Sequence, residues 1–258
     1  MNLCIDVGNT TINFGFYKDN VLVKKVSFTT SKELDKANYL SMITSSLKVN
    51  EINSDDIKNI MYSSVVPYVT GILKEILSDI FKNAKIYELN NDAPHNIKMD
   101  IDNPNEVGSD LIADLVAAKE KYDLPLLVID LGTATKLLLL TKEGVFTSAL
   151  ILPGVAVSAA SLFENAALLP EVDLNNHSSL LDSKNTINCI KHGILFGHLE
   201  SIYGLATRYE KEIGYKLNKI VTGGNAVFFK DLFNNEYQFD DNLVLDGTKI
   251  VLNRIINK

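Results

Sequence analysis

The sequence predicts an α/β protein made of two duplicated halves, residues 1–118 and 119–258. Both halves open with the same order of three strands joined by short turns. In both, the first strand is an apolar run that ends in an Asp-x-Gly turn, at Asp6 in the first half and at Asp130 in the second. Helical spacing of apolar residues follows each set of strands, as in α/β folds. The repeated order indicates an internal duplication.

The first half begins with three apolar or alternating runs, and the short turns between them predict an antiparallel start to its sheet. Ser31 precedes a run with helical spacing, and a further helix and two short strands follow. Pro94, Pro104 and several Asn and Asp residues predict irregular chain up to residue 107. The expected strands are 2–6, 11–17, 21–28, 59–63 and 84–87, and the expected helices are 33–47, 68–81 and 109–121.

The second half repeats this start, with a run over 126–130 that is almost wholly apolar, as in a strand buried on both faces. Its long helix contains Gly193, Gly197 and Gly204, which cost helix stability unless something packs closely against them. We expect that contact either within the subunit or with a second copy of the chain. The expected strands are 126–130, 134–141, 145–151, 219–222 and 243–245, and the expected helices are 155–167, 185–213, 226–232 and 248–256.

Composition excludes several classes of protein. Of the 258 residues, 46% are hydrophobic and 22% are charged, which is typical of folded domains. The net charge of −7 and the lack of a Lys/Arg cluster argue against a nucleic-acid partner. Cys4 and Cys189 are too few for a disulfide framework, and the four histidines lack metal-ligand spacing. With no apolar stretch near ~20 residues and no secretory signal pattern, we expect a cytoplasmic protein without membrane contact.

The two Asp-x-Gly turns have the chemistry of phosphate-binding loops. Glycine lets the backbone approach a phosphate, and the amides and hydroxyls that follow can donate to its oxygens. A carboxylate at the strand end can hold Mg²⁺ together with phosphate oxygens. A third motif, Thr222-Gly223-Gly224, places two glycines between a strand and a helix. Although one Asp-x-Gly turn alone is common in hairpins, the three together predict a nucleotide cleft between the two halves.

The motifs in this order resemble the superfamily of acetate and sugar kinases, Hsp70 chaperones and actin, and within it type III pantothenate kinase. The resemblance covers nearly the whole chain. It implies two ribonuclease H-like halves, as in actin-like ATPases. The segments that carry it are DVGNTTINFG at 6–15, SSVVP at 63–67, DNPNEVGSD at 102–110, DLGTAT at 130–135, ILPG through LLPEVDL at 151–174, NTINCIKHGI at 185–194 and TGGNA at 222–226.

The resemblance also implies a reaction, transfer of the γ-phosphoryl group of ATP to pantothenate as the first step of coenzyme A biosynthesis, in a homodimer. It implies Mg²⁺ and a monovalent cation, K⁺ or NH₄⁺. The residues that match the family's site are Asp110 as general base; Asp6, Val7, Gly8, Asn9, Thr10, Thr11, Ile12, Asn13 and Thr133 for ATP; Gly108, Ser109, Asp110, Leu111 and Thr186 for pantothenate; and Asp130 for the monovalent cation.

Four departures from the family pattern lie near these residues. Leu111 stands where the family has Arg, and Ile101 stands where it has Tyr. Ser148-Ala149 replaces Gly-Gly, and Lys136 stands where the second loop usually continues with Thr. Leu111 shares a helix face with apolar residues and is expected in the core. Lys136 either approaches a phosphate or faces solvent, and we expect solvent.

Three functions are compatible with the sequence. The first is a pantothenate kinase, and the second is a kinase for another small alcohol. The third is a catalytically silent or regulatory paralogue, such as the Bvg accessory factor branch. Retention of Asp6, Asp110 and Asp130 favours an enzyme, although Asp110 would also suit the first turn of a helix by its charge alone.

Overall fold

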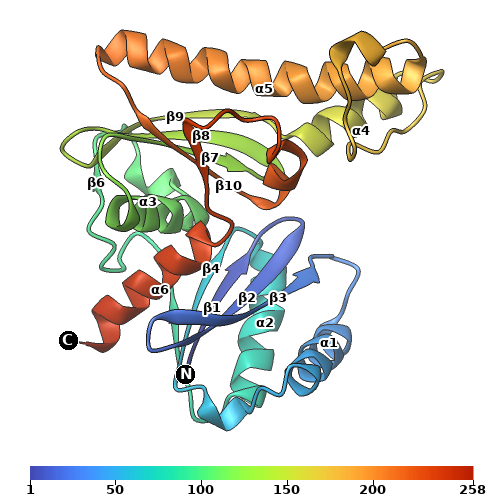
Figure 1. Ribbon diagram of the computed structural model, residues 1–258. Helices are drawn as coiled ribbons and strands as arrows, with labels where there is room; N and C mark the ends of the chain where they lie inside the picture. Colours follow the sequence, from blue (N-terminus) through green and yellow to red (C-terminus); the bar gives the residue numbers. More distant parts are fainter. Residues whose placement is uncertain (258) are drawn as a thin grey trace. The chain divides into compact units, whose positions relative to one another are not determined.

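The computed structural model describes residues 1–257, which form two compact units, each built on one sheet (Figure 1). Unit 1 comprises Met1–Ile97, Ile101–Glu120 and the chain from Asn242 onward. Unit 2 comprises Lys98–Asp100 and Lys121–Asp241. The chain passes from unit 1 to unit 2 after residue 120, whereas the expected boundary was at 118/119. They differ from the expected halves because the last helix packs with unit 1.

Unit 1 has a five-stranded sheet in the order β3-β2-β1-β4-β5. The first three strands are antiparallel, and β4 and β5 continue in parallel from β1. The strands are β1 (Asn2–Val7), β2 (Thr11–Lys18), β3 (Val21–Thr29), β4 (Asn59–Ser64) and β5 (Lys85–Glu88), and the helices are α1 (Lys36–Val49), α2 (Pro67–Ile80), α3 (Ser109–Lys121) and α6 (Leu243–Ile256).

Side-chain alternation along β1 separates the two faces of this sheet. Leu3, Ile5 and Val7 are fully buried in the core formed with α1 and α2. Cys4 points to the opposite face, where α6 packs against β1, β2 and β4. Burial there raises the pKa of the Cys4 thiol far above its usual range, so that this cysteine is an inert core residue, as expected.

Unit 2 has a six-stranded sheet in the order β11-β10-β7-β8-β9-β6, and α5 runs along it beside α4 (Figure 1). Its core lies between the sheet and these two helices, with Leu127, Ile129 and Leu131 of the central strand fully buried. The strands are β6 (Lys98–Met99), β7 (Leu126–Leu131), β8 (Ala134–Leu140), β9 (Val145–Pro153), β10 (Asn218–Thr222) and β11 (Tyr237–Phe239), and the helices are α4 (Val155–Asn165) and α5 (Thr186–Ile213).

The predicted duplication is confirmed by the two sheets. The order β3-β2-β1-β4-β5 of unit 1 returns in unit 2 as β9-β8-β7-β10-β11, with the same antiparallel and parallel pairings. Only the two-residue β6 is added at the edge of the second sheet. In residues 1–257 no helix is long and apolar enough to cross a membrane.

Several expected elements were wrong in detail. The strand expected at 243–245 is the first turn of α6, because a three-residue apolar run does not distinguish a strand from a helix. The helix expected at 226–232 is a short 3₁₀ segment, Gly224–Phe229. The first helix starts after Asp35, which forms a capping box with Asn38, rather than after Ser31.

The glycines of α5 do not pack closely within the subunit. Apart from the neighbouring backbone of the helix itself, no atom of the described residues lies within 4 Å of the place that a Cβ would take at Gly193, Gly197 or Gly204. Of the two expected kinds of contact, the one within the subunit is therefore wrong.

Candidate active site

The first glycine turn connects β1 to β2 at one edge of the unit 1 sheet. The Gly8 amide donates to the Thr11 carbonyl at 2.9 Å, and the Thr30 hydroxyl donates to the Gly8 carbonyl at 2.8 Å. These bonds hold the turn, while the Asn9, Thr10 and Thr11 side chains remain exposed. The turn thus presents donors to solvent on a fixed backbone, as a phosphate loop requires.

Asp6 lies just before this turn and is paired across the hairpin with Asn13. The Asn13 side-chain amide donates to the Asp6 carboxylate at 3.4 Å, and the Ser27 hydroxyl donates to the Asn13 side-chain oxygen at 2.7 Å. Val7 and Ile12 were also predicted to contact ATP, but their side chains are buried in the core. Only the backbone of those two residues is available to a ligand.

Asp110 lies in the first turn of α3, and Ser109 connects this turn to the end of β4. The Ser109 hydroxyl accepts hydrogen bonds from the Ser63 hydroxyl at 3.0 Å and from the Ser64 amide at 2.9 Å. Ser63 is fully buried and is the register partner of Asp6 in the parallel β1–β4 pair. The structure therefore brings Asp6, Ser109 and Asp110 to one edge of the unit 1 sheet.

The Asp110 carboxylate folds back over Gly108. A Cβ at Gly108 would lie 2.5 Å from Asp110 Oδ1, and the same oxygen accepts from the Leu111 amide at 2.9 Å. The carboxylate is half-buried in the first turn of α3. A carboxylate at this position can accept a proton from an alcohol.

The residues that replace the family's Arg and Tyr provide no polar groups. Leu111 is half-buried at the start of α3, rather than fully in the core as expected, and Ile101 is also half-buried. Ser148, at the replaced Gly-Gly, has its hydroxyl 2.9 Å from the Tyr209 hydroxyl and thereby connects β9 to α5.

The second glycine turn, in unit 2, connects β7 to β8 and adjoins the third motif. Asp130 of β7 is the register partner of Thr222 in β10. Gly223 has φ +96°, and a Cβ there would lie 2.5 Å from Asp130 Oδ1, so only glycine fits. The Asn225 side-chain amide donates to the Gly132 carbonyl at 2.8 Å. These contacts connect the second and third motifs, with Thr133 exposed at the turn.

Lys136 does not face solvent, so the expected orientation was wrong. Lys136 lies directly opposite Asp130 in the β7–β8 pair, and its Nζ is 2.9 Å from Asp130 Oδ2. The side chains are only 19% and 11% exposed, respectively. The sequence did contain a signal for this contact, since the two residues flank a tight hairpin turn at equal distance.

Thr186, the other expected pantothenate contact, begins α5 and lines a hollow of about 640 Å³ in unit 2. The walls are largely apolar and include Leu162, Leu169 and Ile190. Asn185 caps the helix there by accepting from the Asn188 amide at 2.9 Å. Thr186 thus belongs to unit 2, whereas Gly108 to Leu111 belong to unit 1.

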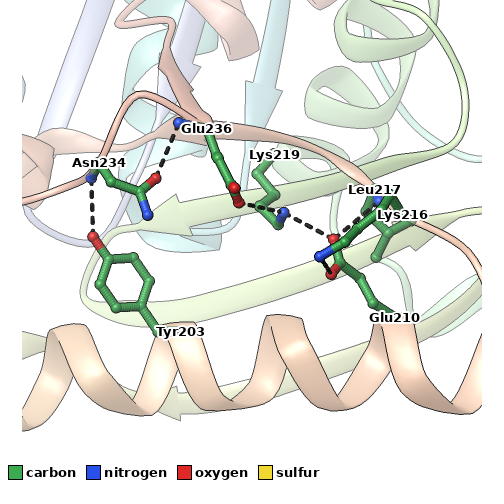
Figure 2. Close-up of polar contacts among 7 residues, drawn as sticks. All are labelled: Tyr203, Glu210, Lys216, Leu217, Lys219, Asn234 and Glu236. Carbon is green, nitrogen blue, oxygen red and sulfur yellow. Dashed lines mark hydrogen bonds and ion pairs between the residues drawn. The ribbon is translucent and has the colours of Figure 1, made fainter.

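A buried ion-pair cluster anchors β10, the strand that leads to Gly223 (Figure 2). Lys219 of β10 is 6% exposed and lies 2.8 Å from Glu210 of α5 and 3.3 Å from Glu236. Glu210 also pairs with Lys216 at 2.7 Å and accepts from the Leu217 amide at 3.1 Å. Burial raises the pKa of Glu210, but these hydrogen bonds outweigh it and lower that pKa to about 2.

Two of the four histidines are buried and lie within hydrogen-bond distance of hydroxyl groups. His198 is mostly buried, and its Nε2 lies 2.9 Å from the Thr135 hydroxyl. His192 is buried against Ser178 and Ser183. In residues 1–257, no group of three or more His, Cys, Asp or Glu side chains is placed to hold a metal ion.

A family model described as type III pantothenate kinase matches residues 2–208. This chain belongs to the type III pantothenate kinase family. The relative of that name from Citrifermentans bemidjiense is 34% identical over 256 residues, covering 98% of this chain and 99% of its own. The relative of that name from Exiguobacterium sibiricum is 33% identical over 254 residues, with 98% and 99% covered.

Solved structures with lower identity share the fold. A Baf family protein from Campylobacter jejuni has a TM-score of 0.57 at 20% identity, covering 99% of this chain and 100% of that one. Component A of the (R)-2-hydroxyglutaryl-CoA dehydratase of Acidaminococcus fermentans has a TM-score of 0.55 at 15% identity, covering 97% and 98%. Together with the duplicated sheets, these likenesses confirm the expected fold class of two ribonuclease H-like halves.

The pantothenate kinase family implies ATP and a divalent metal, and unit 1 has donors that fit Mg²⁺. Mg²⁺ takes one or two carboxylates and completes its shell with phosphate oxygens and water. Asp6, beside an exposed glycine turn, supplies such a carboxylate.

The residues at Asp130 do not fit a separate monovalent cation in the same way. The Lys136 ammonium already lies 2.9 Å from this carboxylate. A second cation at Asp130 would lie against that ammonium, and the two like charges would repel each other.

Proposed function

We propose that this chain transfers the γ-phosphoryl group of ATP to the primary hydroxyl of pantothenate, forming 4'-phosphopantothenate, the first step of coenzyme A biosynthesis. Two full-length relatives at 33–34% identity carry the name type III pantothenate kinase. The observation that carries the proposal is the position of Asp110. Its carboxylate lies over Gly108, and Ser109 ties its helix turn to the strand beside Asp6.

The residues divide the work of the reaction. Asp110 accepts the hydroxyl proton as the alcohol oxygen bonds to the γ-phosphorus, and the bond from that phosphorus to the bridging oxygen breaks to release ADP. Backbone and hydroxyl donors of Gly8 to Thr11, and Thr133 in unit 2, hold the phosphates. Asp6 would hold Mg²⁺, which would supply positive charge to the phosphates when bound. Gly108, Ser109, Leu111 and Thr186 contact pantothenate.

Product detection by mass spectrometry tests this function. The protein is incubated with ATP, Mg²⁺, K⁺ and pantothenate, beside Asp110→Asn and a control, Asp92→Asn, an exposed carboxylate in the same unit. We expect phosphopantothenate from the wild type and the control, and a loss of at least 100-fold in Asp110→Asn. No product from a folded protein that binds ATP would contradict the proposal.

The apolar Leu111 and Ile101 favour two alternatives. Without the donors of Arg and Tyr, the site has fewer groups to recognise pantothenate. The same assay run with a panel of small alcohols separates them. A different phosphorylated product would indicate another substrate, and no product with any alcohol would indicate a catalytically silent or regulatory paralogue.

We also infer a homodimer that uses the exposed face of α5, and a cytoplasmic location, which suits two free cysteines. The glycines of α5 leave open space along the helix, and small residues let helices approach closely. Light scattering tests the dimer. We expect the wild type to have the mass of two chains and Gly197→Leu to shift towards one. A monomeric wild type, or an unaltered dimer in Gly197→Leu, would exclude this interface.

A further inference from the structure

The ion pair of Asp130 and Lys136 stands at the second glycine turn. The two residues face each other across β7 and β8, so their side chains project from the same face of the sheet. Asp130 Oδ1 lies against the Gly223 backbone, and Oδ2 is 2.9 Å from Lys136 Nζ. One carboxylate oxygen is therefore close to backbone, and the ammonium contacts the other.

A carboxylate at this place needs a positive neighbour when a nucleotide binds. The turn with the exposed Thr133 is the expected phosphate contact of unit 2, and Asp130 lies one residue before the end of the strand leading to it. Two negative charges a few Å apart in a partly buried site repel each other more strongly than they would in water. A cation bound to the carboxylate removes that repulsion.

The Lys136 side chain has the charge and the place for this role. Lysine carries a compact ammonium with a full positive charge, and in Lys136 this charge lies beside the Asp130 carboxylate. Because Lys136 is only 19% exposed and its strand is hydrogen-bonded on both sides, its ammonium is held near the turn. A free cation must instead be bound from solution.

We propose that the Lys136 ammonium serves as a built-in monovalent cation, so that this chain binds nucleotide without added K⁺ or NH₄⁺. The inference rests on the proposed kinase function for its link to catalysis. Its first consequence, nucleotide binding that is independent of K⁺, is measured without pantothenate.

The experiment is calorimetric titration with the Mg²⁺ complex of a non-hydrolysable ATP analogue. It is run in tetramethylammonium chloride and in potassium chloride at equal ionic strength. We expect the wild-type Kd to agree within twofold between the two salts. In Lys136→Thr, which restores the family's usual residue, we expect binding at least tenfold weaker without K⁺ and recovery when K⁺ is added.

Two further variants serve as a charge-retaining replacement and as a control. Lys136→Arg retains the positive charge and should bind without K⁺ if Lys136→Thr fails to fold. Lys142→Thr removes an exposed lysine beyond the end of the same strand and should behave as the wild type does. A tenfold gain in wild-type affinity on adding K⁺, or K⁺-independent binding by folded Lys136→Thr, would overturn the proposal.

A parallel assay of phosphopantothenate in both salts separates this inference from the kinase proposal. Nucleotide binding without K⁺ but no product in either salt would support the built-in cation and contradict the proposed kinase function. Product that appears only with K⁺ would contradict the built-in cation and support the proposed kinase function. No nucleotide binding in either salt would overturn both.

Discussion

Gly108 controls where the Asp110 carboxylate lies. A Cβ at residue 108 would be 2.5 Å from Asp110 Oδ1, the end of a short and movable side chain. Relief of that overlap needs rotation of Asp110 rather than movement of backbone. The position of Asp110, the proposed general base, is therefore expected to be more sensitive to residue 108 than the stability of the fold is.

We expect Gly108→Ala to lower kcat for phosphoryl transfer by about 10- to 100-fold, because small misplacement of a catalytic group has effects of this size. Thermal unfolding should change little. The matched control is Gly71→Ala on α2, where a Cβ meets nothing within 4 Å and replacing a helical glycine stabilises by about 1 kcal/mol. Unchanged kcat in Gly108→Ala would show that this contact does not place Asp110.

At the same scale, the sequence predicts the two glycine turns better than it predicts the residues that contact them. Asp6 and Asp130 follow apolar runs and precede glycine, a pattern that predicts both strand ends to within one residue. The orientation of Lys136 was missed because solvent is the usual place for a strand lysine, and its pairing depends on register across the hairpin. The contact between Gly223 and Asp130 depends on a parallel pairing between distant segments, which spacing alone does not reveal.

At the scale of elements, α5 and β10 are joined by the Glu210–Lys219 pair (Figure 2). The folded pKa of Glu210 is about 2, against an ordinary value of 4.5. A lowered folded pKa gives stability above the unfolded pKa, and that stability is lost as pH falls through the folded pKa. The pair therefore loses its contribution in the window from about pH 4.5 to about pH 2.

We predict that lowering the pH from 7 to 3 removes about 2 kcal/mol more unfolding free energy from the wild type than from Glu210→Gln. Urea unfolding at the two pH values measures the difference. Glu164→Gln, an exposed carboxylate of α4, is the control and should follow the wild type. Equal losses in the wild type and Glu210→Gln would mean that the pair has no such effect.

Element boundaries were predictable where local chemistry marks them. The long helix expected at 185–213 is α5 at Thr186–Ile213, because Asn185 caps its start and Gly214 ends it in the left-handed conformation. The 3₁₀ segment after Gly223 was not predictable as such. Its path follows from the contact of Gly223 with Asp130 and from the bond of Asn225 to the Gly132 carbonyl, both made with another hairpin.

At the scale of the whole molecule, helix α6 belongs to unit 1 although it follows unit 2 in the sequence. Helix α6 packs on the face of the unit 1 sheet opposite α1 and α2, with Leu243, Leu245 and Val251 buried. The duplicated motifs predict where the two sheets begin. They do not predict that α6 packs with unit 1, because the buried face of α6 fits either half on composition alone.

At Gly247, α6 lies directly against the backbone of α3. A Cβ there would overlap the backbone of Ala113, which cannot rotate away as a side chain can. We predict that Gly247→Ala destabilises unit 1 by about 3 kcal/mol through overpacking. Hydrogen exchange measured by mass spectrometry should show faster exchange in residues 1–97 and 101–120, with residues 121–241 less affected.

Gly71→Ala, in the same unit but with open space around its Cβ, is the control and should exchange no faster than the wild type in either unit. Faster exchange in Gly247→Ala confined to residues 121–241 would place α6 with the second unit and contradict the division found here. Faster exchange in residues 1–97 would mean that the first half of the chain depends for its stability on the last helix, which folds onto it from the opposite end of the sequence.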